Sequence, residues 1–156
     1  MHFRLLNMFF LTTCCLTNGF GQPGKPATWS FSTKRVSESE FVLILSATLS
    51  PGWHLYSQHL EEGGPLPTRI TFHPGNGFAP AGETREEGTP VQFFDSIYEM
   101  NITWYADSVS FHQNIRLSKP AATVTGTIEY MTCNEHLCIP HKKDFSIDIP
   151  PRAKTP

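Results

Sequence analysis

The stretch ATVTGTIEYMT, residues 122–132, alternates between apolar and polar side chains with a period of two. The apolar members share one parity and are Ala122, Val124, Ile128 and Tyr130. Because successive side chains of a strand point to opposite faces of a sheet, this pattern predicts a half-buried strand. The same period occurs in residues 108–117, SVSFHQNIRL, and in residues 145–149, FSIDI. The sequence therefore indicates a protein built from β-strands.

Further strand candidates lie around these segments. Residues 41–49, FVLILSATL, form a continuous run of apolar and β-branched residues, which predicts a strand buried largely on both faces. The shorter candidates are residues 28–33, 53–57, 69–72 and 99–105. Thirteen prolines and eleven glycines leave few windows long enough for an amphipathic helix. About eight short strands without alternating helices predict an all-β, immunoglobulin-like antiparallel β-sandwich, with a β-barrel as the alternative.

Two connections between these strands are longer than an ordinary hairpin loop. They comprise residues 58–67 and residues 74–90, and both are rich in glycine and proline. Loops of this length inside a small domain often carry function, so we expect both to remain irregular and to take part in binding or chemistry.

The composition restricts the class of protein. The chain has 156 residues, of which 39% are hydrophobic and 17% charged, so it should fold, and it is too short for two ordinary domains. The formal net charge is −2, and Lys142 and Lys143 form almost the only basic cluster. Such a charge distribution argues against nucleic acid or an anionic membrane surface as a partner.

The N-terminus has the layout of a secretory signal peptide. Arg4 precedes an apolar stretch, residues 5–16, which is too short to span a membrane, and small residues follow it. We expect cleavage after Gly21, so that residues 1–21 are the signal peptide and residues 22–156 form a single exported domain. The alternative, lipoprotein acylation within LTTC, residues 11–14, fits less well because a threonine precedes the cysteine.

Cleavage would leave two cysteines, Cys133 and Cys138, within EYMTCNEHLCIPHKKDF, residues 129–145. The spacing C-x2-H-x-C-x2-H could supply four zinc ligands, but structural zinc sites usually draw their ligands from two separated segments. We therefore expect no metal and no other cofactor. A cysteine hydrolase is also disfavoured, because a second cysteine five residues away would trap the nucleophile as a disulfide in an oxidising compartment.

From the residues alone, the two cysteines could form either a structural disulfide or a redox-active dithiol. A disulfide that closes so short a ring stabilises a fold by only about 2 kcal/mol on the chain-entropy model, which weakens the case for a staple. In favour of a working pair, His136 and His141 flank the cysteines, and Lys142 and Lys143 follow. Positive charge near a thiol favours the thiolate, which is the species that attacks disulfides.

Four segments, in this order, resemble the N-terminal periplasmic domain of the DsbD transmembrane thiol:disulfide reductases. They are PGWHLYS, GGPLPTRITF, FDSIYEMNITWYADSVSF and YMTCNEHLCIP. The resemblance extends over about residues 29–149. It implies an immunoglobulin-like sandwich, a periplasmic location and a thiol:disulfide oxidoreductase that relays electrons through Cys133 and Cys138. The second cysteine of that family's pair bonds to partners, which implies that Cys138 attacks and Cys133 resolves.

The resemblance also implies partners. The electron donor would be a thioredoxin-like domain fed by a membrane-embedded DsbD-like reductase, and we expect it to be a separate protein here. The acceptors would be periplasmic disulfide oxidoreductases, such as disulfide isomerases or the thioredoxins of cytochrome c maturation. The second function left open, from a different class, is a non-catalytic accessory module of the cell envelope whose disulfide is structural.

A cap loop that shields the cysteines is a further feature of the family. Residues 93–100, FFDSIYEM, match that loop, with Asp95 in it and Tyr98 as the shielding aromatic residue. Tyr56 matches a tyrosine that borders the family's site, and His136 would border it from the loop between the cysteines. Two departures bear on the choice of partner: the cap residue is tyrosine where phenylalanine is usual, and the segment between the cysteines is one residue shorter.

Overall fold

The computed structural model describes residues 25–73, 75 and 77–151, so the predicted signal peptide lies outside the described residues. Within this part of the chain the backbone forms strands and turns and no helix, and so no helix that could cross a membrane. The strands are β1 (Ala27–Arg35), β2 (Glu40–Leu49), β3 (His54–Tyr56), β4 (Arg69–Phe72), β5 (Phe78–Asp95), β6 (Met100–Leu117), β7 (Ala122–Cys133) and β8 (Cys138–Ile149).

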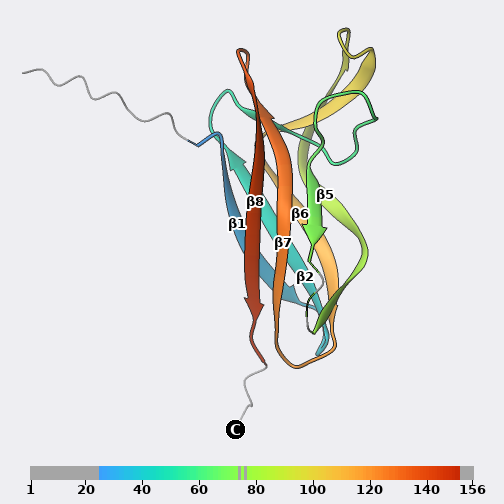
Figure 1. The fold of residues 1–156 in the computed structure, drawn as a ribbon, viewed down its shortest axis with the longest axis vertical. Coiled ribbons are helices and arrows are strands. Elements are labelled where there is room, and N and C mark those ends of the chain that lie inside the picture. Colours follow the sequence, from blue (N-terminus) through green and yellow to red (C-terminus); the bar gives the residue numbers. More distant parts are fainter. Residues whose placement is uncertain (1–24, 74, 76, 152–156) are drawn as a thin grey trace, which may run out of the picture.

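All strand pairings are antiparallel, and the sheet curls so that its two halves face each other (Figure 1). Along the sheet the order is β1, β2, β6, β3, β7, β4, while β5 pairs with β6 and β8 pairs with β7. Strand β3 is short and joins the two halves, since it pairs with both β6 and β7. Phe31 of β1 meets Phe145 of β8, with ring centroids 5.6 Å apart, along one open side. The predicted immunoglobulin-like β-sandwich is confirmed.

The alternating pattern of β7 matches its burial. Val124, Ile128 and Tyr130 are buried in the main core, as predicted, and Ala122 packs against it. Strand β2 differs from its prediction, because only one of its two faces is fully buried. Its buried residues are Phe41, Leu43, Leu45, Ala47 and Leu49. The other face of β2 lies on the outside of the sandwich and is half-buried to exposed, so a continuous apolar run here belongs to a one-sided strand.

The prediction of an irregular loop over residues 74–90 is wrong, because most of that segment belongs to β5. The ladder between β5 and β6 shifts register between Ala81 and Arg85 and again between Gly88 and Pro90. These irregularities accommodate glycine and proline within a long strand. Strand β5 has only β6 as a neighbour, so its prolines interrupt no second ladder. The loop from residue 57 to residue 68, in contrast, has no strand, as predicted.

Two further strand boundaries differ from their predictions. The segments predicted separately as residues 99–105 and 108–117 form the single strand β6, and Asp107, in the gap between them, has a positive φ of 43°. Aspartate tolerates this left-handed conformation better than most residues. Strand β8 begins at Cys138 rather than at Phe145, because Pro140 is accommodated in a strand that pairs on one side only. Strands β7 and β8 therefore form one long hairpin that ends at the two cysteines.

Candidate functional site

Cys133 and Cys138 close the end of the β7–β8 hairpin. They are direct partners in the ladder, with Cα atoms 4.1 Å apart, and they form a disulfide. The turn between them is held by Asn134, whose Oδ1 accepts hydrogen bonds from the backbone N–H groups of His136 (2.8 Å) and Leu137 (2.9 Å). Asparagine side chains commonly stabilise turns in this way. The disulfide therefore sits at one extremity of the fold.

The two cysteines have different environments. Cys133 is 2% exposed and packs against Tyr56 and Ile102, whereas Cys138 is exposed. An incoming thiolate needs access to the sulfur that it attacks. Of the two sulfurs, that of Cys138 is therefore the more open to attack by an external thiolate.

Cys133 belongs to a small apolar cluster on the outer face of the sheet, which we call the site cluster. Its buried members are Tyr56, Ile102 and Cys133, and its partly buried members are Leu60, Met100, Trp104 and Met131. The residues next to these along the strands, such as Leu55 and Tyr105, point instead into the main core. Alternation along β3, β6 and β7 thus places the site cluster on the face opposite the main core.

The predicted cap residues form the end of the β5–β6 hairpin, which projects from the same end of the molecule as the disulfide hairpin (Figure 1). Asp95 Oδ1 accepts hydrogen bonds from the backbone N–H groups of Ile97 (2.8 Å) and Tyr98 (3.1 Å) and so holds the turn. We call residues 90–104 the arm. The exposed large apolar side chains of the arm are Val91, Phe93, Phe94, Ile97 and Tyr98.

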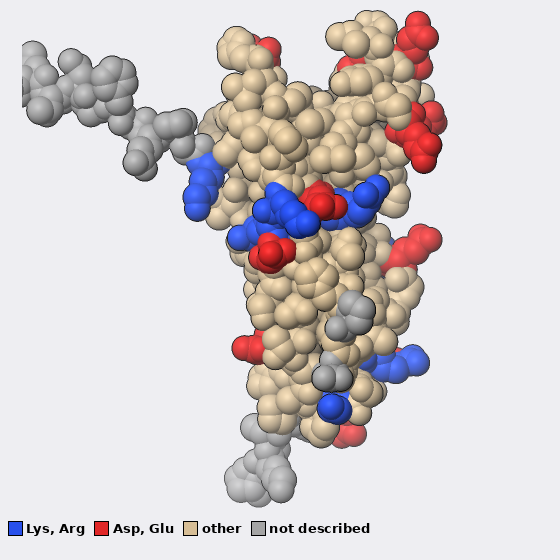
Figure 2. Space-filling model, viewed as in Figure 1, with Lys and Arg blue, Asp and Glu red and all other residues tan. Residues whose placement is uncertain are grey.

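The arm and the disulfide hairpin lie on either side of a hollow at this end of the molecule (Figure 2). In that view the end carries no visible lysine or arginine, and the basic side chains gather in a band lower on the molecule. Val91 pairs with Trp104 and Phe93 pairs with Ile102, so both lie on the face of the sheet that carries the site cluster. The accessible cysteine is therefore at one end of an apolar face that continues along the arm.

Tyr56 packs in the same cluster as the buried cysteine, and charged groups of the arm affect its pKa. Burial, followed by the charges of Tyr98 and Asp95, raises the pKa of Tyr56 above its ordinary value. Tyr98 itself is 43% exposed, and its turn stands apart from the turn between the cysteines in Figure 1. Its role as a shield stays a prediction.

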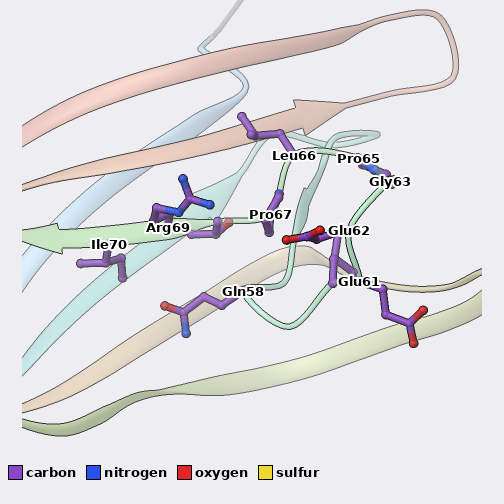
Figure 3. A pocket seen from close by; sticks show the side chains of 12 residues that line it. Gln58, Glu61, Glu62, Gly63, Pro65, Leu66, Pro67, Arg69 and Ile70 are labelled. Carbon is purple, nitrogen blue, oxygen red and sulfur yellow. The ribbon is translucent and has the colours of Figure 1, made fainter.

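The β3–β4 loop, residues 57–68, covers part of the site cluster. A Cβ on Gly64 would lie 2.6 Å from Met100 Sδ, so the loop backbone packs directly on the start of β6, next to the turn of the arm. The loop also encloses a hollow of about 640 Å³ (Figure 3), which Glu61, Glu62, Arg69 and Ile70 help to line. Leu60 is the residue that this hollow shares with the site cluster.

Glu86 of β5 anchors the start of this loop. Its Oε2 accepts hydrogen bonds from the hydroxyls of Ser57 (2.7 Å) and Tyr105 (2.8 Å), and its Oε1 accepts one from the Gln58 N–H (2.6 Å). Burial and the bond to Glu86 raise the pKa of Tyr105 far above its ordinary value. The polar groups of the loop start are thereby satisfied beside the apolar site cluster.

His141 and Lys142, which we expected to place positive charge beside the thiols, contact other residues. His141 stacks on Tyr130 with ring centroids 4.7 Å apart, on the main-core face of β8, and its Nε2 lies 2.8 Å from Thr132 Oγ1. Lys142 pairs with Glu129 at 3.6 Å. The turn residue His136 is exposed and precedes Cys138 by two residues. Strand alternation explains why His141, three residues after Cys138, faces away from the disulfide.

The geometry does not suit the zinc alternative. The two cysteines are bonded to each other, and His141 lies on the opposite face of the sheet. Among the residues that the structure describes, no group of three or more His, Cys, Asp and Glu side chains is arranged to hold a metal ion.

Sequence reasoning missed His54, which the structure places next to Cys133. His54 is the direct ladder partner of Cys133, and its ring contacts those of Tyr56 and Trp104. One signal was available: His54 and Tyr56 are two residues apart in a predicted strand, so any strand that brings Tyr56 to the site brings His54 to the same face.

The fold and the pair of one exposed and one buried cysteine at the end of a hairpin are compatible with a thiol:disulfide interchange domain. The chain belongs to the family described as thiol:disulfide interchange protein DsbD, N-terminal, whose model matches residues 22–149.

Solved structures agree on the fold. The N-terminal periplasmic domain of ScsB from Proteus mirabilis is 19% identical, with a TM-score of 0.56 over 83% of this chain and 50% of that chain. The chain therefore spans half the length of that ScsB structure. The Neisseria meningitidis DsbD N-terminal domain in its reduced form is 15% identical, with a TM-score of 0.52 over 87% of this chain and 94% of that one. No curated protein matches the chain.

Proposed function

We propose that this domain relays reducing equivalents through the Cys133–Cys138 pair to oxidoreductases of the periplasm. The observation that supports the proposal best is the asymmetry of the pair, with Cys138 exposed and Cys133 buried in the site cluster. A purely structural disulfide has no need of such a difference in access. A relay requires this difference in access, because one sulfur must react with partner proteins while the other reacts only within the domain.

The exchange takes two steps. The Cys138 thiolate attacks a disulfide sulfur of the acceptor, forms a mixed disulfide and expels the acceptor's second sulfur as a thiolate. Cys133 then attacks Cys138 Sγ, closes the intramolecular disulfide and releases the acceptor's remaining sulfur. Two electrons pass from the cysteine pair to the acceptor. Reduction of the domain by its donor follows the same steps in reverse, with the donor attacking at Cys138.

Membership of the family supports a donor and acceptors that exchange thiols and disulfides, and we propose their kinds from it. The donor is a thioredoxin-like domain or a membrane-embedded DsbD-like reductase, and the acceptors are periplasmic disulfide oxidoreductases, including those of cytochrome c maturation. A periplasmic location is supported by the predicted signal peptide, residues 1–21, and by the periplasmic source of the ScsB domain.

The arm supplies the cap in this proposal. Tyr98 shields the disulfide from small oxidants and thiols, and Asp95 holds the turn that carries it. The tip of the arm exposes Ile97 and Tyr98, whereas Ile102 and Trp104 nearer its base pack in the site cluster, so a docking partner can displace the tip alone at modest cost.

The reduction potential of the Cys133–Cys138 couple tests the proposal. The purified domain is equilibrated with thioredoxin redox buffers of graded potential, and the fraction reduced is measured by thiol alkylation. A relay predicts a potential more oxidising than about −300 mV, whereas structural disulfides of secreted proteins typically lie below that value. A bond that stays oxidised with reduced thioredoxin in excess would support the alternative, an accessory module with a structural disulfide.

A further inference from the structure

His54 is fixed beside the buried member of the cysteine pair. In the ladder between β3 and β7 it lies directly opposite Cys133. Side chains at opposed positions of antiparallel strands point to the same face, with Cβ atoms about 4.5–5.5 Å apart. The half-buried imidazole of His54 and the sulfur of Cys133 are therefore neighbours on the outer face of the sheet.

Two aromatic side chains hold the His54 ring. Trp104 lies against it with ring centroids 4.3 Å apart, and the ring of Tyr56 meets it nearly perpendicularly at 5.3 Å. His54 Nε2 is 3.4 Å from the Tyr56 hydroxyl. Tyr56 and Trp104 both belong to the site cluster that surrounds Cys133. The imidazole is thus placed at the edge of the same apolar environment as the sulfur.

The second step of exchange needs a proton acceptor at this place. Cys133 reacts as a thiolate, but burial in an apolar cluster disfavours the charged form of a thiol. Burial also lowers the pKa of His54 below its ordinary value of 6.5, so its imidazole is neutral at neutral pH and free to accept a proton.

The other titratable groups near His54 are poorly suited to this task. Tyr56 has a raised pKa, and the neighbouring Asp95 and Tyr98 lie on the arm and act electrostatically on Tyr56. On β7 and β8, Glu129 is paired with Lys142, and His141 faces the main core. Trp104, the contact on β6, does not titrate.

We propose that His54 accepts the proton of the Cys133 thiol as this thiol attacks the mixed disulfide on Cys138, an inference that rests on the proposed relay. The S–H proton passes to the imidazole, the bond between Cys133 Sγ and Cys138 Sγ forms, and the bond from Cys138 Sγ to the partner's sulfur breaks. The partner leaves as a thiolate, and the imidazolium returns its proton to that thiolate or to solvent. In the reverse direction the imidazolium protonates Cys133.

The reaction of the reduced domain with dithiobis(nitrobenzoate), followed by stopped-flow absorbance, separates the two steps. Attack by Cys138 releases the first nitrothiobenzoate at a rate that depends on reagent concentration. Attack by Cys133 on the resulting mixed disulfide releases the second at a rate that does not. For His54→Gln we expect the second phase to slow by roughly 10- to 100-fold near neutral pH, and the deficit to shrink as alkaline pH ionises the thiol directly.

His59→Gln is the matched control, since His59 is exposed on the β3–β4 loop and lies outside the site cluster. Both of its phases should stay within about twofold of wild type. A second phase unchanged in His54→Gln would overturn the proposal. So would a deficit of equal size at every pH, because that is the signature of a merely structural role.

Wild-type measurements keep the proposal testable if His54→Gln does not fold. The acid limb of the second phase should have the same midpoint as the His54 imidazole titration followed by NMR, and that midpoint should lie below 6.5. Midpoints that disagree would refute the role of His54. A wild-type domain that releases only one nitrothiobenzoate would instead refute the relay itself, so the two failures are distinguishable.

Discussion

Replacing Glu86 by alanine should loosen the loop that covers the site cluster. The change removes the acceptor of three hydrogen bonds, from the Ser57 and Tyr105 hydroxyls and from the Gln58 N–H. Ser57 is 1% exposed and Tyr105 is 5% exposed, so their hydroxyls have little access to water as a substitute partner. A hydrogen bond to a charged group contributes about 1.5–3 kcal/mol, and an unsatisfied buried donor costs about 1–3 kcal/mol.

These values give an expected loss of about 3 kcal/mol for Glu86→Ala, because the three bonds share one carboxylate and the contributions of neighbouring interactions do not add in full. Glu86→Gln keeps one acceptor oxygen and should lose about 1 kcal/mol. The matched control is Glu87→Ala at the next position, whose side chain is 60% exposed and pairs with His112 at 3.4 Å. Exposed pairs contribute about 0–1 kcal/mol.

Urea unfolding of the oxidised domain measures this series from the shift in midpoint at constant slope. The reasoning predicts the order Glu86→Ala, Glu86→Gln, Glu87→Ala from most to least destabilised. It also predicts faster reduction of the disulfide in Glu86→Ala. The loop carries Leu60, which packs in the cluster around Cys133, and a loosened loop would hold Leu60 there less firmly. Equal losses at Glu86 and Glu87 would refute the anchoring role of Glu86.

Three further predictions concern the core, the pH dependence and the cap. A Cβ on Gly126 would lie 2.4 Å from Phe145 Cζ and 2.5 Å from the Thr71 carbonyl oxygen, so Gly126→Ala should cost about 3 kcal/mol in urea unfolding, and a loss below about 1 kcal/mol would contradict that packing. Burial lowers the pKa of His141 below 6.5, so the unfolded chain binds a proton before the folded chain as pH falls, and stability should drop below that pH. His141→Gln should lessen this drop between neutral and acidic urea titrations, and an undiminished drop would exclude His141 as its source. Tyr98→Ala should speed the reaction of the reduced cysteine pair with a small thiol reagent roughly several-fold, because Tyr98 is proposed to cover the thiols as a lid. An unchanged rate would exclude Tyr98 from this role.

Local patterns in the sequence predicted those parts of the fold whose residues alternate cleanly. Strand β7 follows its alternation almost to the residue, since one of its faces packs on the main core. Strand β5 could not be found in this way, because its glycines and prolines are accommodated by register shifts on an edge strand. The start of β8 was obscured by Pro140 for a similar reason.

Part of the candidate site could also be predicted from the sequence, on different grounds. The two cysteines were singled out from the residues themselves, whereas the predicted cap segment and Tyr56 came from the resemblance to a family, and the structure places all of them at one end of the molecule. His54 was not found, because its position depends on β3, a strand of three residues that pairs across a long sequence distance with Cys133. Such a pairing leaves no local signal of its own, and the spacing of two residues between His54 and Tyr56 was the one indication in the sequence.

The central claim is that Cys138 meets partners while Cys133 completes the exchange. Reduced Cys133→Ala and Cys138→Ala variants are each mixed with an oxidised thioredoxin-like protein, and the mixed disulfide is followed by gel shift without reductant. The exposure of Cys138 and the burial of Cys133 predict a stable mixed disulfide in Cys133→Ala that forms at least roughly tenfold faster than in Cys138→Ala. Equal rates in the two variants, or capture through Cys133 alone, would contradict the account.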